Sequence, residues 1–256
     1  MRIVLFGTGN LATRLGLALQ SKKAEIVQVY GRTESSCSHL AEMLGCRFTV
    51  SKENIAENAD LFLLALTESA IPEVLSGLKI KNQMIVHTSG SISLNSIADW
   101  SNNCGVFYPL QTLSAQKEVD FSAIPVCIEA NTPVNLQILH DLASSISPKV
   151  YHINSEQRRQ LHLSAVFVCN FVNHLYAIGE KLLSEQQLDF DLLKPLIRET
   201  AEKALLFSPE EVQTGPAVRG NLSIQEMHLQ MLEQHPQWQQ IYKQISLNIA
   251  STQKTH

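Results

Sequence analysis

The chain has 256 residues, of which 45% are hydrophobic and 17% are charged, a composition that excludes a disordered or fibrous protein and favours a soluble globular one. Its formal net charge of -4 excludes the basic surface that attracts nucleic acid or an anionic membrane, so we expect neither as a partner. The five cysteines are scattered without a CxxC pair, which indicates free thiols in a reducing cytoplasm and no metal site.

The first half of the chain alternates short apolar segments with segments of helical periodicity. Residues 2–6 predict a strand, and apolar residues at helical spacing from Leu11 predict the helix after it. The continuous apolar segment 61–66 is typical of a parallel strand that is buried on both faces. This alternation predicts an α/β fold with a doubly wound sheet. Further strands are expected at 26–30, 47–50, 84–87, 106–108, 125–130 and 150–153, and further helices at 35–44, 70–75 and 134–145.

The pattern changes after Asn154, where no further β-like alternation is found. Residues 156–183 predict one long helix that is apolar around most of its circumference. No apolar run in the chain approaches the ~20 residues of a membrane span, so we expect a protein of the cytoplasm. We therefore expect two domains, an α/β domain over residues 1–154 and an all-helical domain over residues 155–256. Further helices are expected at 188–207, 224–234 and 238–249, and a disordered tail at 251–256.

A glycine-rich turn joins the first strand to the first helix. The segment Gly7-Thr8-Gly9-Asn10-Leu11-Ala12 has the GxGxxA spacing of the turn that binds a dinucleotide in Rossmann domains. In such a turn the first glycine permits the tight bend, the second lets the backbone approach a pyrophosphate, and N–H groups of the helix N-terminus bind phosphates. A glycine turn without a ligand is the alternative, which the strand-turn-helix context disfavours. All six residues are expected to form part of a cofactor site in a Rossmann domain.

The end of the second strand indicates NADP, with NAD as the less favoured cofactor. In NAD sites an Asp or Glu about 20 residues after the turn holds the ribose hydroxyls. Here Arg32 and Thr33 occupy that region, and Arg32 stands where a 2′-phosphate would lie. One charge-assisted hydrogen bond contributes ~1.5 to 3 kcal/mol, which corresponds to a ten-fold preference or more. The alternative is that Arg32 is a solvated loop residue and that Glu34 binds the ribose.

Residues at three later strand ends are candidates for the rest of the site. Leu66 and Thr67, and then Ser89 and Gly90, follow strands at the edge where ligands gather in such sheets, and we expect them beside the nicotinamide. Turn chemistry alone would also account for them. Further along, Tyr108 and Gln111 in the segment YPLQ are expected to contact the substrate, although the proline alone would explain a simple turn.

The long helix carries a polar stripe. At 100° per residue, Arg158, His162, Asn170 and Asn173 fall on one face, and enclosed polar groups need partners such as a substrate. We expect His162 to donate a proton while a hydride is transferred, with Asn170 and Asn173 orienting the substrate. A core histidine satisfied by a neighbour is the commoner alternative. In the loop 215–220, Arg219 is expected to bind a carboxylate or phosphate of the substrate, with a surface salt bridge as the alternative.

Taken together, these motifs resemble a bacterial family that joins a Rossmann-like NADP-binding domain to a C-terminal helical domain of unknown function. The resemblance covers nearly the whole chain, and Asn221 stands where the family commonly has Asp. The family is similar to the β-hydroxyacid dehydrogenase, ketopantoate reductase and pyrroline-5-carboxylate reductase superfamily, which implies a homodimer formed through the helical domain. The resemblance rests on the glycine turn, on the segments 86–90, 108–112 and 215–220, on the Asn170 region and on His228.

The resemblance also bears on the chemistry. Hydroxyacid and ketopantoate enzymes use a lysine on the first helix of the second domain, but this sequence has no lysine between Lys149 and Lys181, so His162 or Arg158 would have to replace it. This difference favours C=N reduction, because an iminium substrate already carries its proton. The leading hypothesis is an NADP-dependent oxidoreductase that acts on a small, anionic carbonyl or imine compound. The alternatives are a non-catalytic NADP(H)-binding redox sensor that engages a partner protein, and a Rossmann domain that binds another nucleotide.

Overall fold

The computed structural model describes residues 1–20, 22, 24–114 and 117–252. The chain forms two compact units, Met1–Cys169 and Asn170–His256. The boundary between the units lies within the long helix that begins after Asn154. Of the expected tail, Ser251 and Thr252 belong to the last helix, and the other four residues lie outside the described residues.

The first unit is built on one sheet, which has eight strands in the described part of the chain, in the order β3-β2-β1-β4-β5-β6-β7-β8. Neighbouring strands are parallel except β6 and β7, which are antiparallel. The chain proceeds outwards in opposite directions from β1 and β4, and in such sheets ligands bind outside the carboxyl ends of the strands at this reversal. The strands are β1 (Arg2–Phe6), β2 (Glu25–Tyr30), β3 (Arg47–Thr49), β4 (Leu61–Leu64), β5 (Met84–His87), β6 (Cys104–Pro109), β7 (Val126–Ala130) and β8 (Val150–His152).

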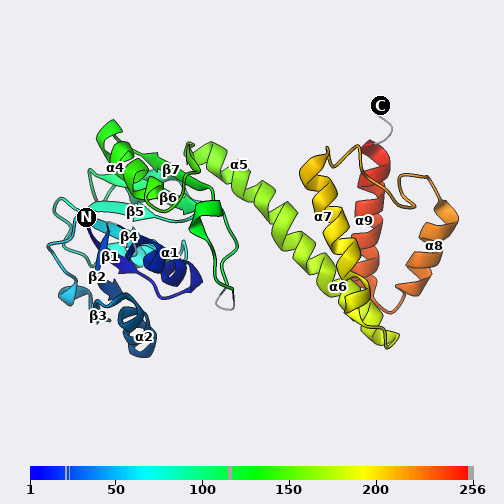
Figure 1. Ribbon diagram of the computed structural model, residues 1–256, viewed down its shortest axis with the longest axis horizontal. Coiled ribbons are helices and arrows are strands. Elements are labelled where there is room, and N and C mark those ends of the chain that lie inside the picture. Colours follow the sequence, from blue (N-terminus) through cyan, green and yellow to red (C-terminus); the bar gives the residue numbers. More distant parts are fainter. Residues whose placement is uncertain (21, 23, 115–116, 253–256) are drawn as a thin grey trace. The chain divides into compact units, whose positions relative to one another are not determined.

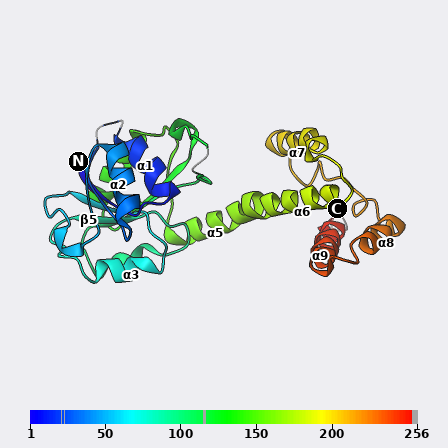
Figure 2. The same cartoon turned by 90° about the horizontal axis from the view of Figure 1, so that it is seen from below.

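Helices cover both faces of this sheet, which confirms the doubly wound fold. Helices α1 (Asn10–Gln20), α2 (Glu34–Leu44) and α4 (Pro133–Ser144) pack on one face. Helix α3 (Ala70–Leu75) packs on the other face (Figure 2). The 3-10 turn η2 (Leu94–Ile97) contributes to the same core as α3. Because side chains alternate along a strand, β1 contributes Ile3 and Leu5 to the first core and Val4 and Phe6 to the second. Two further short 3-10 turns are η1 (Lys52–Asn54) and η3 (Phe121–Ala123).

The long helix consists of α5 (Ser155–Ala165), a π-helical stretch (Val166–Phe171) and α6 (Val172–Glu185). Its start is fixed by a capping box, in which Asn154 and Gln157 each accept a hydrogen bond from the other's backbone N–H. The π-helical stretch lies between His162 and the end of the helix, and its wider turn changes the angle per residue. A spacing of 100° per residue therefore does not hold from His162 to Asn170 and Asn173. The expectation that these three residues share one helix face is corrected accordingly.

The second unit contains helices joined by loops and no strand in its described part, as the sequence predicts (Figure 1). The single helix expected over residues 188–207 is divided into the 3-10 turn η5 (Phe190–Leu192) and helix α7 (Lys194–Leu206). Pro195 explains the division, because proline lacks the N–H of a helix interior and is favoured in a first turn. Helices α8 (Leu222–Met231) and α9 (Pro236–Thr252) complete the unit.

The apolar segment of the long helix is longer than we expect from the sequence. The span Ser155–Glu185 contains an 18-residue window with a mean hydropathy of 1.4, and by length and composition alone such a helix is able to cross a membrane. No residue of that window is buried within the chain. The expectation that no apolar segment reaches membrane-spanning length is therefore corrected, although one such helix is weak support for a membrane location because a core helix of a soluble protein passes the same test.

Candidate cofactor and catalytic site

The glycine turn lies between β1 and α1, at the carboxyl edge of the sheet. Gly7 has a φ of +112°, and a Cβ at this position would lie 2.2 Å from the carbonyl oxygen of Ala65. No residue other than glycine fits this position, because an L side chain rarely adopts such a φ and the contact is with backbone. The Gly7 N–H donates to the Tyr30 carbonyl at 2.8 Å, so the turn is held against both neighbouring strands.

Gly9 faces open space, in contrast to Gly7. A Cβ at Gly9 would meet no atom within 4 Å, and its carbonyl accepts the hydrogen bond from Thr13 N–H that begins α1. The first N–H groups of an α-helix have no partner within the helix, and the helix dipole favours negative charge at that end. Space above Gly9 and donors at the start of α1 together fit a pyrophosphate, so the residues present fit a dinucleotide.

The end of β2 fits the part of a dinucleotide that carries the 2′-phosphate. Gly31 is packed so closely that a Cβ there would lie 2.8 Å from the Cys37 sulfur and 3.1 Å from Thr8 Cγ2. Arg32 and Thr33 follow and are both exposed. Thr33 is the N-cap of α2, yet its side chain makes no capping hydrogen bond, which leaves the hydroxyl able to bind a ligand.

Two strand-end segments meet beside β4 and β5. Leu66 Cδ2 lies 3.5 Å from where a Gly7 Cβ would be, so this residue adjoins the glycine turn, and Thr67 beyond it is exposed. Ser89 is buried, and its hydroxyl donates to Glu68 Oε1 at 2.6 Å. The sequence reading missed Glu68, which the rule that selected Thr67 would have found, since the two are adjacent after the same strand.

Tyr108 and His162 form a pair at the end of β6. The Tyr108 hydroxyl lies 3.1 Å from His162 Nδ1 in a hydrogen bond, and the two rings meet edge to face. Burial raises the pKa of Tyr108, so its hydroxyl stays protonated at neutral pH. A Cβ on Gly90 would lie 2.8 Å from both His162 Nδ1 and Tyr108 Cζ, so glycine at this position lets the loop after β5 pack against the pair. Three residues from separate parts of the sequence are thus in contact.

Arg158 has a structural role that excludes it as a substitute proton donor. Its side chain is 1% exposed and forms an ion pair with Glu129 of β7. The same guanidinium donates to the Ile92 carbonyl and to Ser155 Oγ, and Ser155 in turn donates to Glu129. The network ties the first turn of α5 to the sheet, and His162 follows one turn later. The sequence offers no local signal for it, because Glu129 and Arg158 lie on different elements.

His87, at the end of β5, is a buried histidine beneath the site. It is 0% exposed, and its Nδ1 accepts a hydrogen bond from Ser89 N–H. Burial, and then the charge of Arg158, lower the pKa of His87 to about 3, so the ring is neutral at physiological pH. A neutral ring is a hydrogen-bond acceptor for the loop that carries Ser89 and Gly90.

Four other candidate residues are all exposed. Gln111 lies after β6, where its side chain accepts a hydrogen bond from Thr112 N–H. Asn170, Asn173 and Arg219 belong to the second unit. The structure therefore brings together the residues of the glycine turn and strand ends with Tyr108 and His162, all within the first unit.

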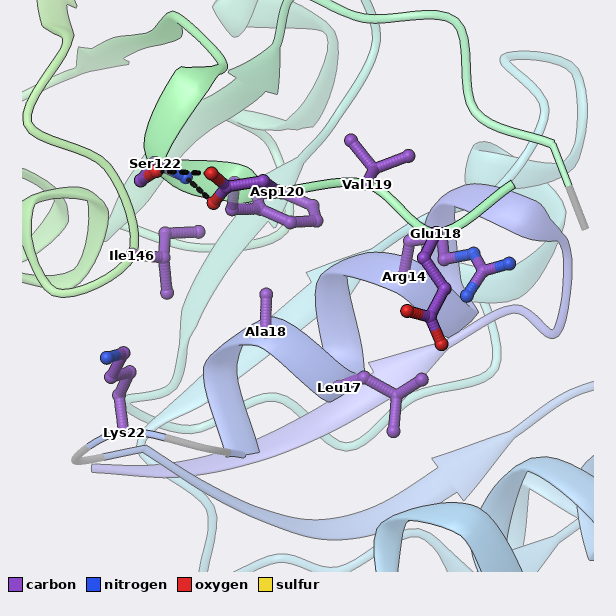
Figure 3. Close-up of a pocket in the computed structure, with 10 residues that line it drawn as sticks. Arg14, Leu17, Ala18, Lys22, Glu118, Val119, Asp120, Ser122 and Ile146 are labelled. Atoms are coloured by element: carbon purple, nitrogen blue, oxygen red, sulfur yellow. Dashed lines mark hydrogen bonds between the residues drawn. The ribbon is translucent and has the colours of Figure 1, made fainter.

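A separate pocket of about 390 Å³ lies beside the C-terminal half of α1 (Figure 3). Its charged groups are of both signs, and Asp120 accepts hydrogen bonds from the N–H and hydroxyl of Ser122. No residue of the glycine turn lines it, so it is distinct from the dinucleotide site. The lining residues are Arg14, Leu17, Ala18, Lys22, Glu118, Val119, Asp120, Phe121, Ser122 and Ile146.

Comparison with known proteins supports NADP as the cofactor. Residues 2–90 match a family described as NADP oxidoreductase, coenzyme F420-dependent, and residues 124–249 match a domain of unknown function, DUF2520. No curated protein matches the chain.

Among solved structures, two neighbours of low identity share the fold. An imine reductase from Myxococcus stipitatus in complex with NADP+ is 13% identical, with a TM-score of 0.67 and coverage of 100% of this chain and 93% of that one. A 1-pyrroline-5-carboxylate reductase from Streptococcus pyogenes is 16% identical, with a TM-score of 0.62 and coverage of 98% of each chain.

A third solved structure is much more similar. It comes from Bacteroides fragilis and is described as an NADP oxidoreductase; it is 43% identical, with a TM-score of 0.93 and coverage of 98% of each chain. The present chain belongs to the family of this Bacteroides fragilis protein, the NADP-dependent oxidoreductases in which a Rossmann domain precedes a DUF2520 helical domain.

Proposed function

We propose that this chain is a reductase or dehydrogenase that transfers a hydride between NADP(H) and the C=O or C=N group of a small compound. The observation that carries the proposal is the Tyr108–His162 pair, which packs against Gly90 at the same sheet edge as the glycine turn. A proton donor beside a dinucleotide site is suited to hydride transfer to a polarised double bond.

The cofactor is held by three groups of residues in this proposal. The turn from Gly7 to Ala12 binds the pyrophosphate, Arg32 and Thr33 bind the 2′-phosphate, and the strand-end residues adjoin the nicotinamide. The support is the open space at Gly9, the exposed side chain of Arg32 and the free capping position of Thr33. The strand-end residues are Leu66, Thr67, Ser89 and Gly90.

His162 supplies the proton. The Tyr108 hydroxyl is hydrogen-bonded to His162 Nδ1, which leaves Nε2 available to the substrate. A bound NADPH would supply the hydride, and His162 in its protonated form would pass the Nε2 proton to a carbonyl oxygen or to an imine nitrogen that does not already carry one, leaving a neutral ring that solvent reprotonates. Tyr108 acts as a positioning residue that holds the His162 ring in place.

The rest of the substrate is bound by polar residues beyond this pair. Gln111 follows the strand that carries Tyr108, and in the second unit Asn170 and Asn173 offer amides while Arg219 offers a guanidinium. Arg219 is the group that would bind a carboxylate or phosphate on an anionic substrate. The missing lysine favours a C=N substrate over a C=O substrate.

The protein functions as a cytoplasmic homodimer in this proposal. In the described part of the second unit, only Ala217 and Leu232 are buried hydrophobic residues. Large apolar side chains on α6, α7, α8 and α9 are exposed in the single chain, and exposed apolar surface of this extent indicates an interface. A second copy of the helical domain would cover it, including the apolar face of the long helix.

The proposal is tested by NADPH oxidation with a panel of small carbonyl and cyclic imine compounds, for the wild type and for His162→Asn. We expect turnover with at least one compound, and a loss of about 10²- to 10⁴-fold in kcat in the variant while NADPH affinity is retained. His140→Asn, on α4, is the matched control and should retain wild-type activity. Tight NADPH binding with no turnover would contradict the proposed function and favour a redox sensor, whereas turnover that His162→Asn leaves unchanged would contradict the role proposed for His162.

A further inference from the structure

A carboxylate that the proposed reaction does not use lies at the end of β4. Glu68 Oε1 accepts hydrogen bonds from the hydroxyls of Ser89 at 2.6 Å and Ser91 at 3.0 Å. The Ser91 N–H donates in turn to Ser89 Oγ at 3.1 Å, so the two serines are fixed relative to each other. Both serines use Oε1, and Oε2 lies outside these two hydrogen bonds.

The serines that hold Glu68 flank the glycine that contacts the Tyr108–His162 pair. Gly90 lies between Ser89 and Ser91, and a Cβ on it would be 2.8 Å from His162 Nδ1. The carboxylate is therefore held by the same loop that packs on the proton donor. The hydrogen bond from Ser89 is the largest of the effects that lower the pKa of Glu68, and it outweighs the opposing effect of burial, so the carboxylate is ionised at neutral pH.

An ionised carboxylate beside the reacting group has a predictable effect on substrate charge. It attracts a cation and repels an anion, and solvent screens both effects because Glu68 is an exposed residue. A partly screened contact between two charges corresponds to about a five-fold change in affinity. An anionic group on the substrate, for which Arg219 is the candidate partner, would have to lie away from Glu68, because the two negative charges repel each other.

We propose that Glu68 is a specificity-determining residue, which selects substrates that carry a positive charge at or next to the reacting carbon, such as a protonated imine. This inference rests on the proposed function, because it assigns the charge preference of the same site. It places the selection on a residue of the cofactor domain, in the loop after β4.

The inference is tested with saturated ring compounds that resemble such substrates and that NADPH cannot reduce. Pyrrolidinium is the cationic probe, tetrahydrofuran the neutral one and cyclopentanecarboxylate the anionic one. Affinity is measured from the change in fluorescence of protein-bound NADPH. For the wild type, pyrrolidinium should bind more tightly than the other two.

The variant Glu68→Gln keeps an oxygen that accepts from both serines and removes only the charge. It should weaken pyrrolidinium binding by about five-fold and leave tetrahydrofuran binding unchanged. Glu57→Gln is the matched control, because Glu57 is also an exposed carboxylate and forms an ion pair with Lys81. Glu57 precedes β4 and Lys81 precedes β5, so this pair lies at the opposite edge of the sheet from Glu68. The control variant should preserve the wild-type preference.

Each other outcome overturns the inference in a distinct way. If pyrrolidinium does not bind, or if Glu68→Gln leaves the ratio of pyrrolidinium to tetrahydrofuran affinity unchanged, Glu68 does not select substrate charge. If the variant changes only the ratio of NADP+ to NADPH affinity, the carboxylate acts on the nicotinamide ring instead. If neither the wild type nor the variants bind NADPH, the proposed function itself fails.

Discussion

Three glycines set how closely the loops of the cofactor domain approach one another. The local backbone packing requires glycine at position 7, because a Cβ there would collide with the Ala65 carbonyl. Gly9 is unconstrained by the protein, which supports its proposed role of leaving room for a ligand. Gly90 brings the loop after β5 against Tyr108 and His162. The same residue type thus serves the fold at Gly7, the proposed cofactor site at Gly9 and the proposed catalytic pair at Gly90.

The buried ring of His87 makes stability depend on pH. Its pKa is lowered from 6.5 to about 3 in the folded protein, so between these values the unfolded state binds a proton that the folded state does not. The contribution of His87 to the free energy of unfolding is therefore fully present above pH 6.5. Between pH 6.5 and about 3 it falls with decreasing pH by about 1.4 kcal/mol per pH unit.

His87→Asn should reduce this dependence, because the Asn side-chain oxygen can still accept from Ser89 N–H and does not titrate. Urea unfolding at pH 7 and pH 5 should show that the wild type loses about 2 kcal/mol more than the variant. An equal loss in the two proteins would mean that His87 is protonated in the folded state.

Sequence reasoning at the residue scale succeeds where a motif has a fixed geometry. The glycine turn could be placed because its spacing and its strand-turn-helix context both follow from phosphate binding. The contact between Tyr108 and His162 could not be placed, because it joins residues far apart in the chain. Glu129 gave no signal, since its importance comes only from the buried arginine that it neutralises.

At the scale of elements, helix α5 is the part that connects sheet and site. Its capping box fixes where the helix starts, and the buried network around Arg158 fixes its first turn to β7 and to the loop at Ile92. Helix α5 thereby places His162 within hydrogen-bonding distance of the Tyr108 hydroxyl. The periodicity of the sequence predicted the extent of this helix, but not the π-helical stretch Val166–Phe171, because the apolar pattern continues through it.

The ion pair between Arg158 and Glu129 should dominate the stability of this element. Glu129→Ala leaves a buried guanidinium without its counter-charge, which costs about 3–5 kcal/mol, whereas Glu129→Leu combined with Arg158→Met removes both charges and should recover most of the loss. Urea unfolding of the two variants tests this. If Glu129→Ala costs less than about 1 kcal/mol, the pair does not hold the helix.

At the scale of the whole molecule, the second, helical unit exposes a large apolar surface that contacts within a single chain do not cover. Leu205, Leu206 and Phe207 are consecutive exposed residues at the end of α7, and Leu206 alone is 75% exposed. The amino-acid pattern predicted that these segments are helices, but a sequence does not reveal whether an apolar face is covered by its own chain or by another.

Sedimentation equilibrium should give twice the 28.5 kDa mass of the chain. Leu206→Glu should weaken the dimer, because it places a charge within the proposed interface. Ile138→Glu, at an exposed apolar residue of α4 in the first unit, is the matched control and should leave the dimer intact. A monomeric wild type, or a dimer that is insensitive to Leu206→Glu, would contradict this interface.

The measurement that tests the central claim most directly is a fluorescence titration with NADPH and with NADH, for the wild type and for Arg32→Ala. The account predicts that the wild type binds NADPH more tightly, and that Arg32→Ala weakens NADPH binding by about ten-fold or more toward the NADH value, because only NADPH carries the 2′-phosphate. NADH binding should be unchanged in the variant. Equal affinities for the two cofactors in the wild type, or no binding of either, would contradict the account.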